Sequence, residues 1–171
     1  MLEVWKQTMP KWRAYLVFAF SVGLFGCDHA TKLAAEEELG AGRVVTVVPH
    51  VLELRYARNH DVAFSALQGW DLPHKAAVLL VVSVLVLALT LALWARHRRR
   101  ASRWDLGDVG FAFVVAGAFG NLGDRLAHGY VIDFIHVTYW PIFNVADACI
   151  VLGLIALGLS RSKARAAAAG P

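Results

Sequence analysis

The stretch Ala76–Ala95, AAVLLVVSVLVLALTLALWA, decides the fold of this chain. It contains 20 residues and no charged side chain, and a helix of that length crosses the roughly 30 Å of hydrocarbon in a bilayer. The rest of the chain shares this bias, because 58% of its 171 residues are hydrophobic and its mean hydropathy is +0.52. An ordinary soluble domain is more polar. The sequence therefore predicts an integral membrane protein.

Three shorter apolar runs accompany this stretch, at Ala14–Cys27, Val109–Gly123 and Ala148–Ser160. Each run is too short to span the hydrocarbon alone, so each helix must include polar residues at one end. We therefore predict one mainly α-helical, polytopic domain over residues 1–171. Its four transmembrane helices are expected at about 13–35, 75–95, 107–124 and 143–160.

Basic residues are concentrated before the first predicted helix, between the second and third, and after the fourth. Because an even number of crossings returns the chain to its starting side, all three groups lie on one face of the membrane. Such groups favour the cytoplasmic face, so we expect both termini in the cytoplasm. The pI near 9.3 then reflects orientation, and nucleic-acid binding is not expected. The groups are Lys6, Lys11 and Arg13; Arg96, Arg98, Arg99, Arg100 and Arg103; and Arg161, Lys163 and Arg165.

The segment between the first two predicted helices differs in character. Arg43–Val48 and Val51–Tyr56 are rich in β-branched residues and are separated by Pro49-His50, which is typical of two short strands. We predict a small β-sheet within about 42–66, on the outer, periplasmic face, and a turn from Arg58. The segment Leu126–Ile142 is interpreted as a short aromatic loop.

Carboxylates gather where the predicted helices reach the outer face. Asp124, Asp133 and Asp147 lie at or between the ends of the third and fourth helices, and Asp28 lies at the end of the first. Acids at the edge of hydrocarbon are costly unless they are paired or have a function. Their convergence on one face therefore indicates a polar site.

Each acid also has a purely structural interpretation. Asp28 and Lys32 are four residues apart, so they can form an ion pair on one side of a helix. Asp133 can be a turn or capping residue, and Asp147 a first-turn acid stabilised by the helix dipole. The functional alternative is that two desolvated carboxyls share one proton and hydrolyse a peptide bond together. One activates water, while the other protonates the carbonyl oxygen.

Other chemistries lack their sequence signatures. There is no His-Glu-x-x-His for a zinc protease and no Gly-x-Ser-x-Gly for a serine hydrolase. The Gly-x-Gly-Asp motif of presenilin-like proteases is also absent. The histidines do not have helical ligand spacing, and Cys27 and Cys149 are interpreted as small apolar residues within the helices. We expect neither a metal nor an organic cofactor.

Five sequence blocks together resemble the bacterial lipoprotein signal peptidase, or signal peptidase II, family. The blocks are Asp28-His29-Ala30-Thr31-Lys32, Arg58-Asn59-x-x-x-Ala63-Phe64, Gly120-Asn121-Leu122-x-Asp124-Arg125, Val131-Ile132-Asp133-Phe134 and Phe143-Asn144-x-Ala146-Asp147. They occur in the family's order and span most of the chain. The resemblance implies a four-helix inner-membrane aspartic endopeptidase with a small outer sheet.

The resemblance also implies a substrate and a set of site residues. Members of the family cleave prolipoproteins just before the diacylglyceryl-modified cysteine of the lipobox, and globomycin inhibits them. Asp133 and Asp147 match the catalytic pair. The surrounding polar residues are Asp28, Lys32, Asn59, Asn121, Asp124, Arg125 and Asn144. We expect a monomer whose partners are the modified prolipoprotein and membrane lipid. Arg125, beside Asp124, is expected to brace the fold through an ion pair.

The chain departs from the family pattern in two places. His60-Asp61-Val62 occupies the stretch where the family usually has a Gly before Ala-Phe, and His29 stands where Gln is common. Since Gly permits backbone angles that Asp adopts less readily, the first departure bears on the loop and on globomycin sensitivity. Neither departure affects the proposed catalytic pair.

Three alternatives remain open from the sequence alone. The outer carboxylates could hold a cation or proton in a membrane binding or transport protein, or the chain could be an inactive relative that binds prolipoproteins. The third alternative concerns the N-terminus, where Leu24-Phe25-Gly26-Cys27 after an apolar run imitates a lipoprotein signal.

Overall fold

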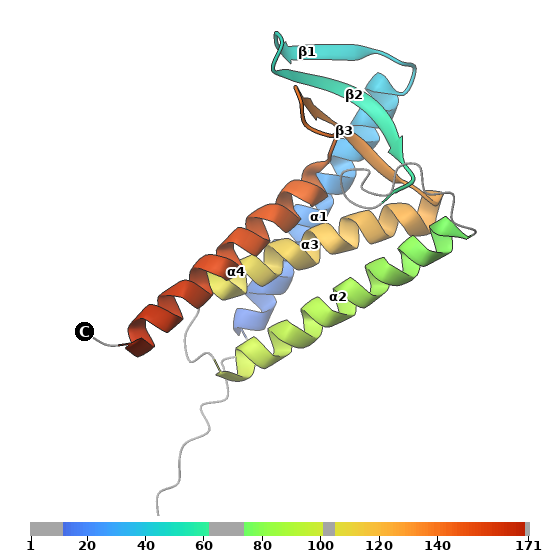
Figure 1. Cartoon of the computed structure of the whole chain (residues 1–171). Helices are drawn as coiled ribbons and strands as arrows, with labels where there is room; N and C mark the ends of the chain where they lie inside the picture. The colour runs from blue at the N-terminus through green and yellow to red at the C-terminus, as the bar shows by residue number, and fades with distance from the viewer. Residues whose placement is uncertain (1–11, 62–73, 101–104, 170–171) are drawn as a thin grey trace, which may run out of the picture.

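Four long helices run beneath a small sheet at one end of the molecule (Figure 1). In the computed structural model, residues 12–61, 74–100 and 105–169 are described. The helices are α1 (Trp12–Leu39), α2 (Lys75–Arg100), α3 (Leu106–His128) and α4 (Val145–Ala169). Each contains a segment long and apolar enough to cross a membrane. The predicted fold class, four such helices with a small sheet, is therefore confirmed.

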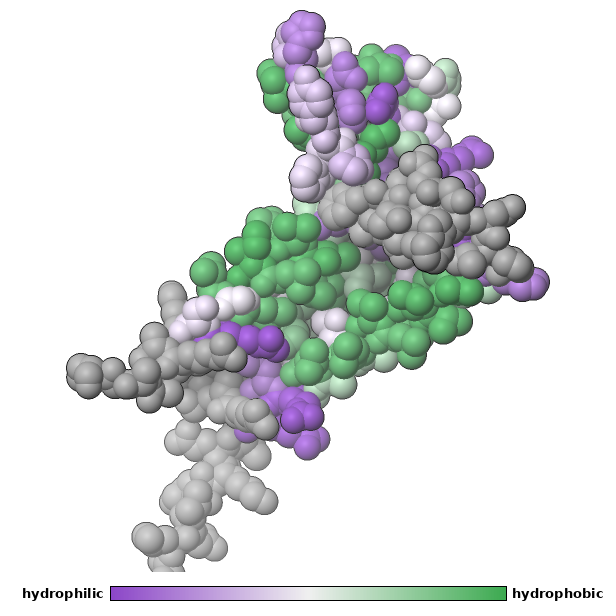
Figure 2. All heavy atoms as spheres, in the orientation of Figure 1, coloured by the Kyte–Doolittle hydropathy of each residue, from purple (hydrophilic) through white to green (hydrophobic). Residues whose placement is uncertain are grey.

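The helices follow the apolar runs of the sequence but extend beyond them. Figure 2 shows a broad apolar surface over the helices, with hydrophilic residues at both ends of the molecule. The helices continue past the predicted span ends near residues 35, 95, 124 and 160, to Leu39, Arg100, His128 and Ala169, because the residues that follow each apolar run also adopt helical structure. We call the end that carries the sheet the sheet end, and the end with Arg96 and Arg161 the basic end.

The sheet has three antiparallel strands in the order β1-β2-β3, formed by β1 (Val44–Val48), β2 (Leu52–Asn59) and β3 (Val131–Val137). Two predictions for this region were wrong. Asn59 ends a strand and pairs with Val131, so the chain does not turn at Arg58. Residues of the predicted aromatic loop form β3. The strand with which they pair, β2, lies far away in the sequence, so the local pattern did not reveal the pairing. Residues 62–66 of the predicted β-rich segment lie outside the described residues.

An apolar contact fastens the sheet to the helices. Ala35 and Leu39 of α1 form a buried cluster with Phe134 of β3. Leu54 and Val145 pack against this cluster from β2 and the start of α4. The extension of α1 beyond the predicted end therefore holds β3 beside the first turn of α4. This placement brings together the two segments that carry Asp133 and Asp147.

α3 is the central helix of the bundle, with 67% of its most apolar window buried, against 17% in each other candidate span. Small residues allow α4 to approach it closely, as is usual between membrane helices. A Cβ atom on Gly117 would overlap the carbonyl oxygen of Ala146. One on Gly153 would lie 2.7 Å from the carbonyl oxygen of Gly110. These glycines therefore set the spacing between the two helices.

Replacing Gly117 with Ala should lower the unfolding free energy by about 1–3 kcal/mol, because the added methyl overlaps a backbone oxygen that cannot rotate away. The measurement is the thermal unfolding midpoint of the purified protein in detergent. Gly158→Ala is the matched control, since no atom lies within 4 Å of its added Cβ. Equal midpoints for the two variants would contradict this account of α3–α4 packing.

Candidate active site

Asp133 and Asp147 reach a common site from different elements at the sheet end. Asp133 lies within β3 and is 2% exposed, and Asp147 lies in the first turn of α4. β3 is fixed by its pairing with β2, where Asp133 is the partner of Ala57. The interpretation of Asp133 as a turn or capping residue is therefore wrong, since the residue lies inside a strand. Asp147 does lie in a first turn, as its alternative interpretation supposed.

Asn144 connects the two carboxylates. Its side-chain amide donates to Asp133 Oδ1 at 2.7 Å and also to the backbone carbonyl of Ile132 at 3.2 Å. Its Oδ1 accepts from the backbone N–H of Asp147 at 2.9 Å, while Asp147 Oδ2 accepts from the backbone N–H of Asn144 at 3.3 Å. This reciprocal pair has the form of a capping box at the start of α4. One buried side chain thus fixes the position of Asp133 relative to Asp147.

Two further amides complete the contacts of the acids. Asn59, the last residue of β2, donates to Asp133 Oδ2 at 2.8 Å. Asn121 of α3 donates to Asp147 Oδ1 at 2.8 Å, and its own Oδ1 accepts from Asn144 at 3.1 Å. Each carboxylate therefore accepts hydrogen bonds at both of its oxygens. Such contacts hold the carboxylate planes in one orientation without adding a positive charge.

A buried ammonium group lies behind this amide network. Lys32 is 1% exposed, and its Nζ lies 2.7 Å from Asp28 and 3.0 Å from Asp124. The ion pair expected from the four-residue spacing of Asp28 and Lys32 therefore forms. Lys32 also donates to Asn121 Oδ1 at 3.3 Å. We call Asp28, Lys32 and Asp124 the buried ion cluster.

The carboxylates of the buried ion cluster also hold the backbone of the two elements that carry the acids. Asp28 Oδ1 accepts from the N–H of Ala146 in α4 at 2.7 Å. Asp124 Oδ2 accepts from the N–H of Ile132 in β3 at 3.0 Å. Each bond ends next to a site acid, since Ala146 precedes Asp147 and Ile132 precedes Asp133. The cluster therefore fixes the site through the main chain as well as through Asn121.

Arg125 has different partners from those predicted. Its guanidinium donates to the backbone carbonyls of Asn121 at 3.2 Å and Asp61 at 3.0 Å. The expected ion pair does not form within the described part of the chain, where no carboxylate lies within 4.0 Å of Arg125, and the neighbouring Asp124 bonds to Lys32 and Ile132. Arg125 consequently braces the end of β2 against α3.

Two residues of this region were not among the predicted site residues. Asp61 forms an ion pair with Lys75, the first residue of α2, and its backbone N–H donates to Asn59 Oδ1 at 2.8 Å. The pair joins the segment after β2 to α2. The sequence singled out Asp61 only as a departure from the family pattern. Nothing in the sequence singled out Lys75, because a basic residue next to an apolar helix is common.

Burial raises the pKa of Asp133 to about 7. The largest cause is loss of hydration around the carboxylate, followed by the negative charge of Asp147. Hydrogen bonds from Asn59 and Asn144 lower this pKa, as does the charge of Lys32, but they do not offset the burial. Near neutral pH the Asp133 carboxyl is therefore partly protonated. A site with one proton on two carboxyls can both accept and donate a proton.

A cleft of about 210 Å³ reaches Asp147 and two of the amides that surround the acids. Its polar wall includes Asn59, Asn121 and Asp147, and its apolar wall includes Val82 and Val86 of α2. The remaining lining residues are Ser83, Ala118, Arg125, Val131 and Ile150. The cleft therefore reaches Asp147 between α2 and α4, two helices that contain candidate membrane spans.

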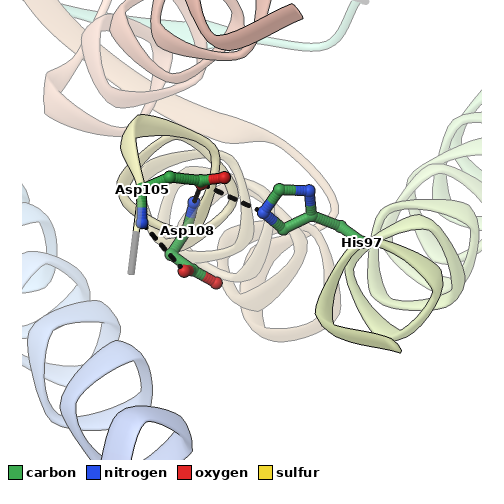
Figure 3. Close-up of side chains that lie close together, drawn as sticks. All are labelled: His97, Asp105 and Asp108. Atoms are coloured by element: carbon green, nitrogen blue, oxygen red, sulfur yellow. Dashed lines mark hydrogen bonds and ion pairs between the residues drawn. The ribbon is translucent and has the colours of Figure 1, made fainter. Parts of the chain in front are cut away.

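The described residues of the site contain no group suited to hold a metal ion. Only His97, Asp105 and Asp108 come close enough together among the residues that the structure describes, and they lie at the basic end (Figure 3). Both cysteines are free thiols, with Cys27 exposed and Cys149 buried. His29 stacks on Phe25 with ring centroids 6.2 Å apart. The side chains that hydrogen bonds join at the sheet end are carboxyls and amides.

Comparisons with known proteins agree on one family. Residues 20–162 match the family Signal peptidase (SPase) II. The chain is 38% identical over 130 residues to the lipoprotein signal peptidase of Pelotomaculum thermopropionicum, covering 76% of this chain and 80% of that protein. It is 40% identical over 145 residues to the lipoprotein signal peptidase of Dichelobacter nodosus, covering 81% and 88% respectively.

Solved structures share the fold. A bacterial membrane enzyme determined by the in meso method at 1.9 Å resolution superposes with a TM-score of 0.72 and 25% identity. The superposition covers 84% of this chain and 90% of that one. A second such structure, at 2.3 Å resolution, also gives a TM-score of 0.72, with 24% identity and coverage of 86% and 88%. The helices and sheet described above therefore have the arrangement of a known bacterial membrane enzyme.

Proposed function

Since this chain belongs to the signal peptidase II family, we propose that Asp133 and Asp147 are its catalytic pair. The chain is an aspartic peptidase that removes signal peptides from prolipoproteins. The observation that carries the proposal is the link through Asn144, which bonds to Asp133 and caps the turn that holds Asp147. Asp28, Lys32, Asn59, Asn121, Asp124, Arg125 and Asn144 are positioning residues in this proposal.

In the proposed reaction the two acids share one proton, which Asp133 carries in the free enzyme. Ionised Asp147 accepts a proton from water as the water oxygen attacks the scissile carbonyl, while Asp133 donates its proton to the carbonyl oxygen. The tetrahedral diol then collapses. Its C–N bond breaks, Asp147 gives its proton to the leaving amine, and one diol hydroxyl returns a proton to Asp133. Both acids therefore end in their starting states.

We further propose that cleavage occurs just before the diacylglyceryl-modified cysteine of the prolipoprotein. The cleft supports this proposal because its polar wall adjoins an apolar wall on α2, a helix with a candidate span. A precursor held by acyl chains and a signal helix would present its scissile bond at this level. The basic residues at the opposite end support an orientation with both termini in the cytoplasm and the site at the periplasmic face.

The experiment that tests the proposal compares two precursors that differ only in the lipid. Purified protein in detergent should cleave a diacylglyceryl-modified prolipoprotein and release a signal peptide that ends just before the modified cysteine. The unmodified precursor should be cleaved at least about tenfold more slowly, because it lacks the acyl contacts that hold it in the cleft. Mass spectrometry of both products is the measurement. Equal rates, or a cut elsewhere, would reject the proposed substrate.

The pKa of Asp133 predicts how cleavage depends on pH. Because Asp133 must be protonated to donate, kcat/KM should fall as the pH rises through about 7. Asn59→Ala removes a hydrogen bond that lowers this pKa, so the fall should move to higher pH in that variant. Rate profiles of both proteins between pH 5 and 9 are the measurement. A fall at the same pH in both would argue against Asp133 as the donor.

A further inference from the structure

A second cavity, of about 450 Å³, lies at the basic end of the helix bundle. It lies where the candidate span of α2 ends at Arg99 and that of α4 ends at Ser162, next to the start of α3 at Leu106. Leu93, Phe111 and Leu157 give it an apolar wall, and its polar wall consists of Arg96, His97, Ser160 and Arg161, with Gly107 between them. The cavity therefore combines charge and apolar surface at the level where a helix leaves the membrane.

The two arginines of this cavity have no counter-charge in the described part of the chain. No carboxylate of the described residues lies within 4.0 Å of Arg96 or Arg161. Arg98 is engaged differently, since its guanidinium lies 5.2 Å from the centroid of the Trp94 ring. Arg96 and Arg161 come from different helices, α2 and α4, and line the same cavity. Two guanidinium groups on one cavity favour an anion there.

Asp105 and Asp108, at the start of α3, cap that helix (Figure 3) and form no ion pair with these arginines. Asp105 Oδ1 accepts from the N–H groups of Gly107 at 2.7 Å and Asp108 at 3.2 Å, and it lies 3.1 Å from His97 Nε2. Asp108 Oδ2 accepts from the N–H of Asp105 at 3.4 Å. A metal ion at this cluster would have to displace the cap. The cluster instead holds His97 in place as one wall of the cavity.

We propose that this cavity binds the phosphate headgroup of an anionic phospholipid. Arg96 and Arg161 donate to the phosphate oxygens, as basic pockets between membrane helices do for acidic headgroups. Leu93, Phe111 and Leu157 contact the glycerol and the first methylenes of the acyl chains. The apolar wall favours a lipid over a free phosphate ion. This proposal concerns the end of the molecule opposite the cleft, so it does not depend on the proposed catalytic pair.

The test measures lipid retention by native mass spectrometry of the purified protein in detergent. Dioleoyl phosphatidylglycerol should be retained, and dioleoyl phosphatidylcholine should not. The double variant Arg96→Gln/Arg161→Gln should bind phosphatidylglycerol at least about tenfold more weakly. The matched control is Arg98→Gln/Arg99→Gln, which removes the same charge from the same end but from outside the cavity. Its affinity should change by less than about twofold.

Three outcomes would overturn the proposal. Equal weakening in the two double variants would indicate general attraction to a basic surface, and retention of both lipids alike would indicate no headgroup selectivity. Competition by millimolar inorganic phosphate would indicate a free-anion site.

The single variants Arg96→Gln and Arg161→Gln should each weaken binding. Both side chains are exposed, so folding should persist. Prolipoprotein cleavage should remain in every variant, which separates this test from that of the catalytic pair.

Discussion

Replacing either Asp133 or Asp147 with Asn should lower kcat for prolipoprotein cleavage by at least about 10³-fold. General acid–base catalysis by one positioned group contributes about 10²- to 10⁴-fold. Each proposed acid acts in both halves of the reaction, so its loss removes two proton transfers. Asn has nearly the same shape as Asp and can still accept a hydrogen bond. The substitution therefore tests proton transfer more than packing.

The measurement is single-turnover cleavage of a diacylglyceryl-modified prolipoprotein, with the thermal unfolding midpoint as the test of folding. Asp105→Asn is the matched control, because it makes the same change at the basic end. Asn is also a good N-cap residue, so the start of α3 should remain stable. Wild-type turnover in a folded Asp133→Asn or Asp147→Asn protein would reject that residue as a catalytic acid.

Replacing Lys32 with Met should destabilise the protein more than any surface change. The substitution leaves Asp28 and Asp124 buried at 2% and 6% exposure without their shared cation. Removing one partner from a buried ion pair typically costs about 3–5 kcal/mol, since the remaining charge has neither water nor a counter-ion. Asp28 and Asp124 also hold Ala146 and Ile132, so the positions of α4 and β3 should become less fixed.

Arg43→Met is the control for this prediction. It breaks the ion pair between Arg43 and Glu38, whose side chains are 58% and 59% exposed, and exposed pairs contribute about 0–1 kcal/mol. The measurement is the thermal unfolding midpoint of each variant in detergent, with the yield of membrane-inserted protein alongside it. Similar midpoints for Lys32→Met and Arg43→Met would show that the buried ion cluster does not stabilise the fold.

The membrane helices could be predicted because their signal is local. The uncharged run Ala76–Ala95 is sufficient by itself, and the other three spans follow from apolar runs with polar ends. The third strand could not be found in this way. Val131–Val137 pairs with residues of β2 that lie 72 to 85 positions earlier, and the intervening chain gives no sign of the pairing.

The site residues show the same division between local and distant information. The Asp28–Lys32 pair follows from a four-residue spacing within one helix, and it forms. The hydrogen bond from Arg125 to Asp61 and the ion pair between Asp61 and Lys75 depend on how β2, α2 and α3 are arranged in space. The central position of Asn144 was likewise not evident, because its bonds to Asp133, Asn121 and Asp147 join three elements. Residue types predicted the chemistry of the site, and only the assembled fold gave its connections.

The distribution of the site over the chain has a consequence for biogenesis. The acids and the side chains that hold them come from α1, β2, α3, β3 and α4, and Asp147 lies on α4, the fourth of the described helices. A nascent chain that has inserted only three spans therefore lacks one of its two acids and the cap that orients it. On the proposed assignment of Asp147, proteolytic competence therefore requires α4 to have inserted.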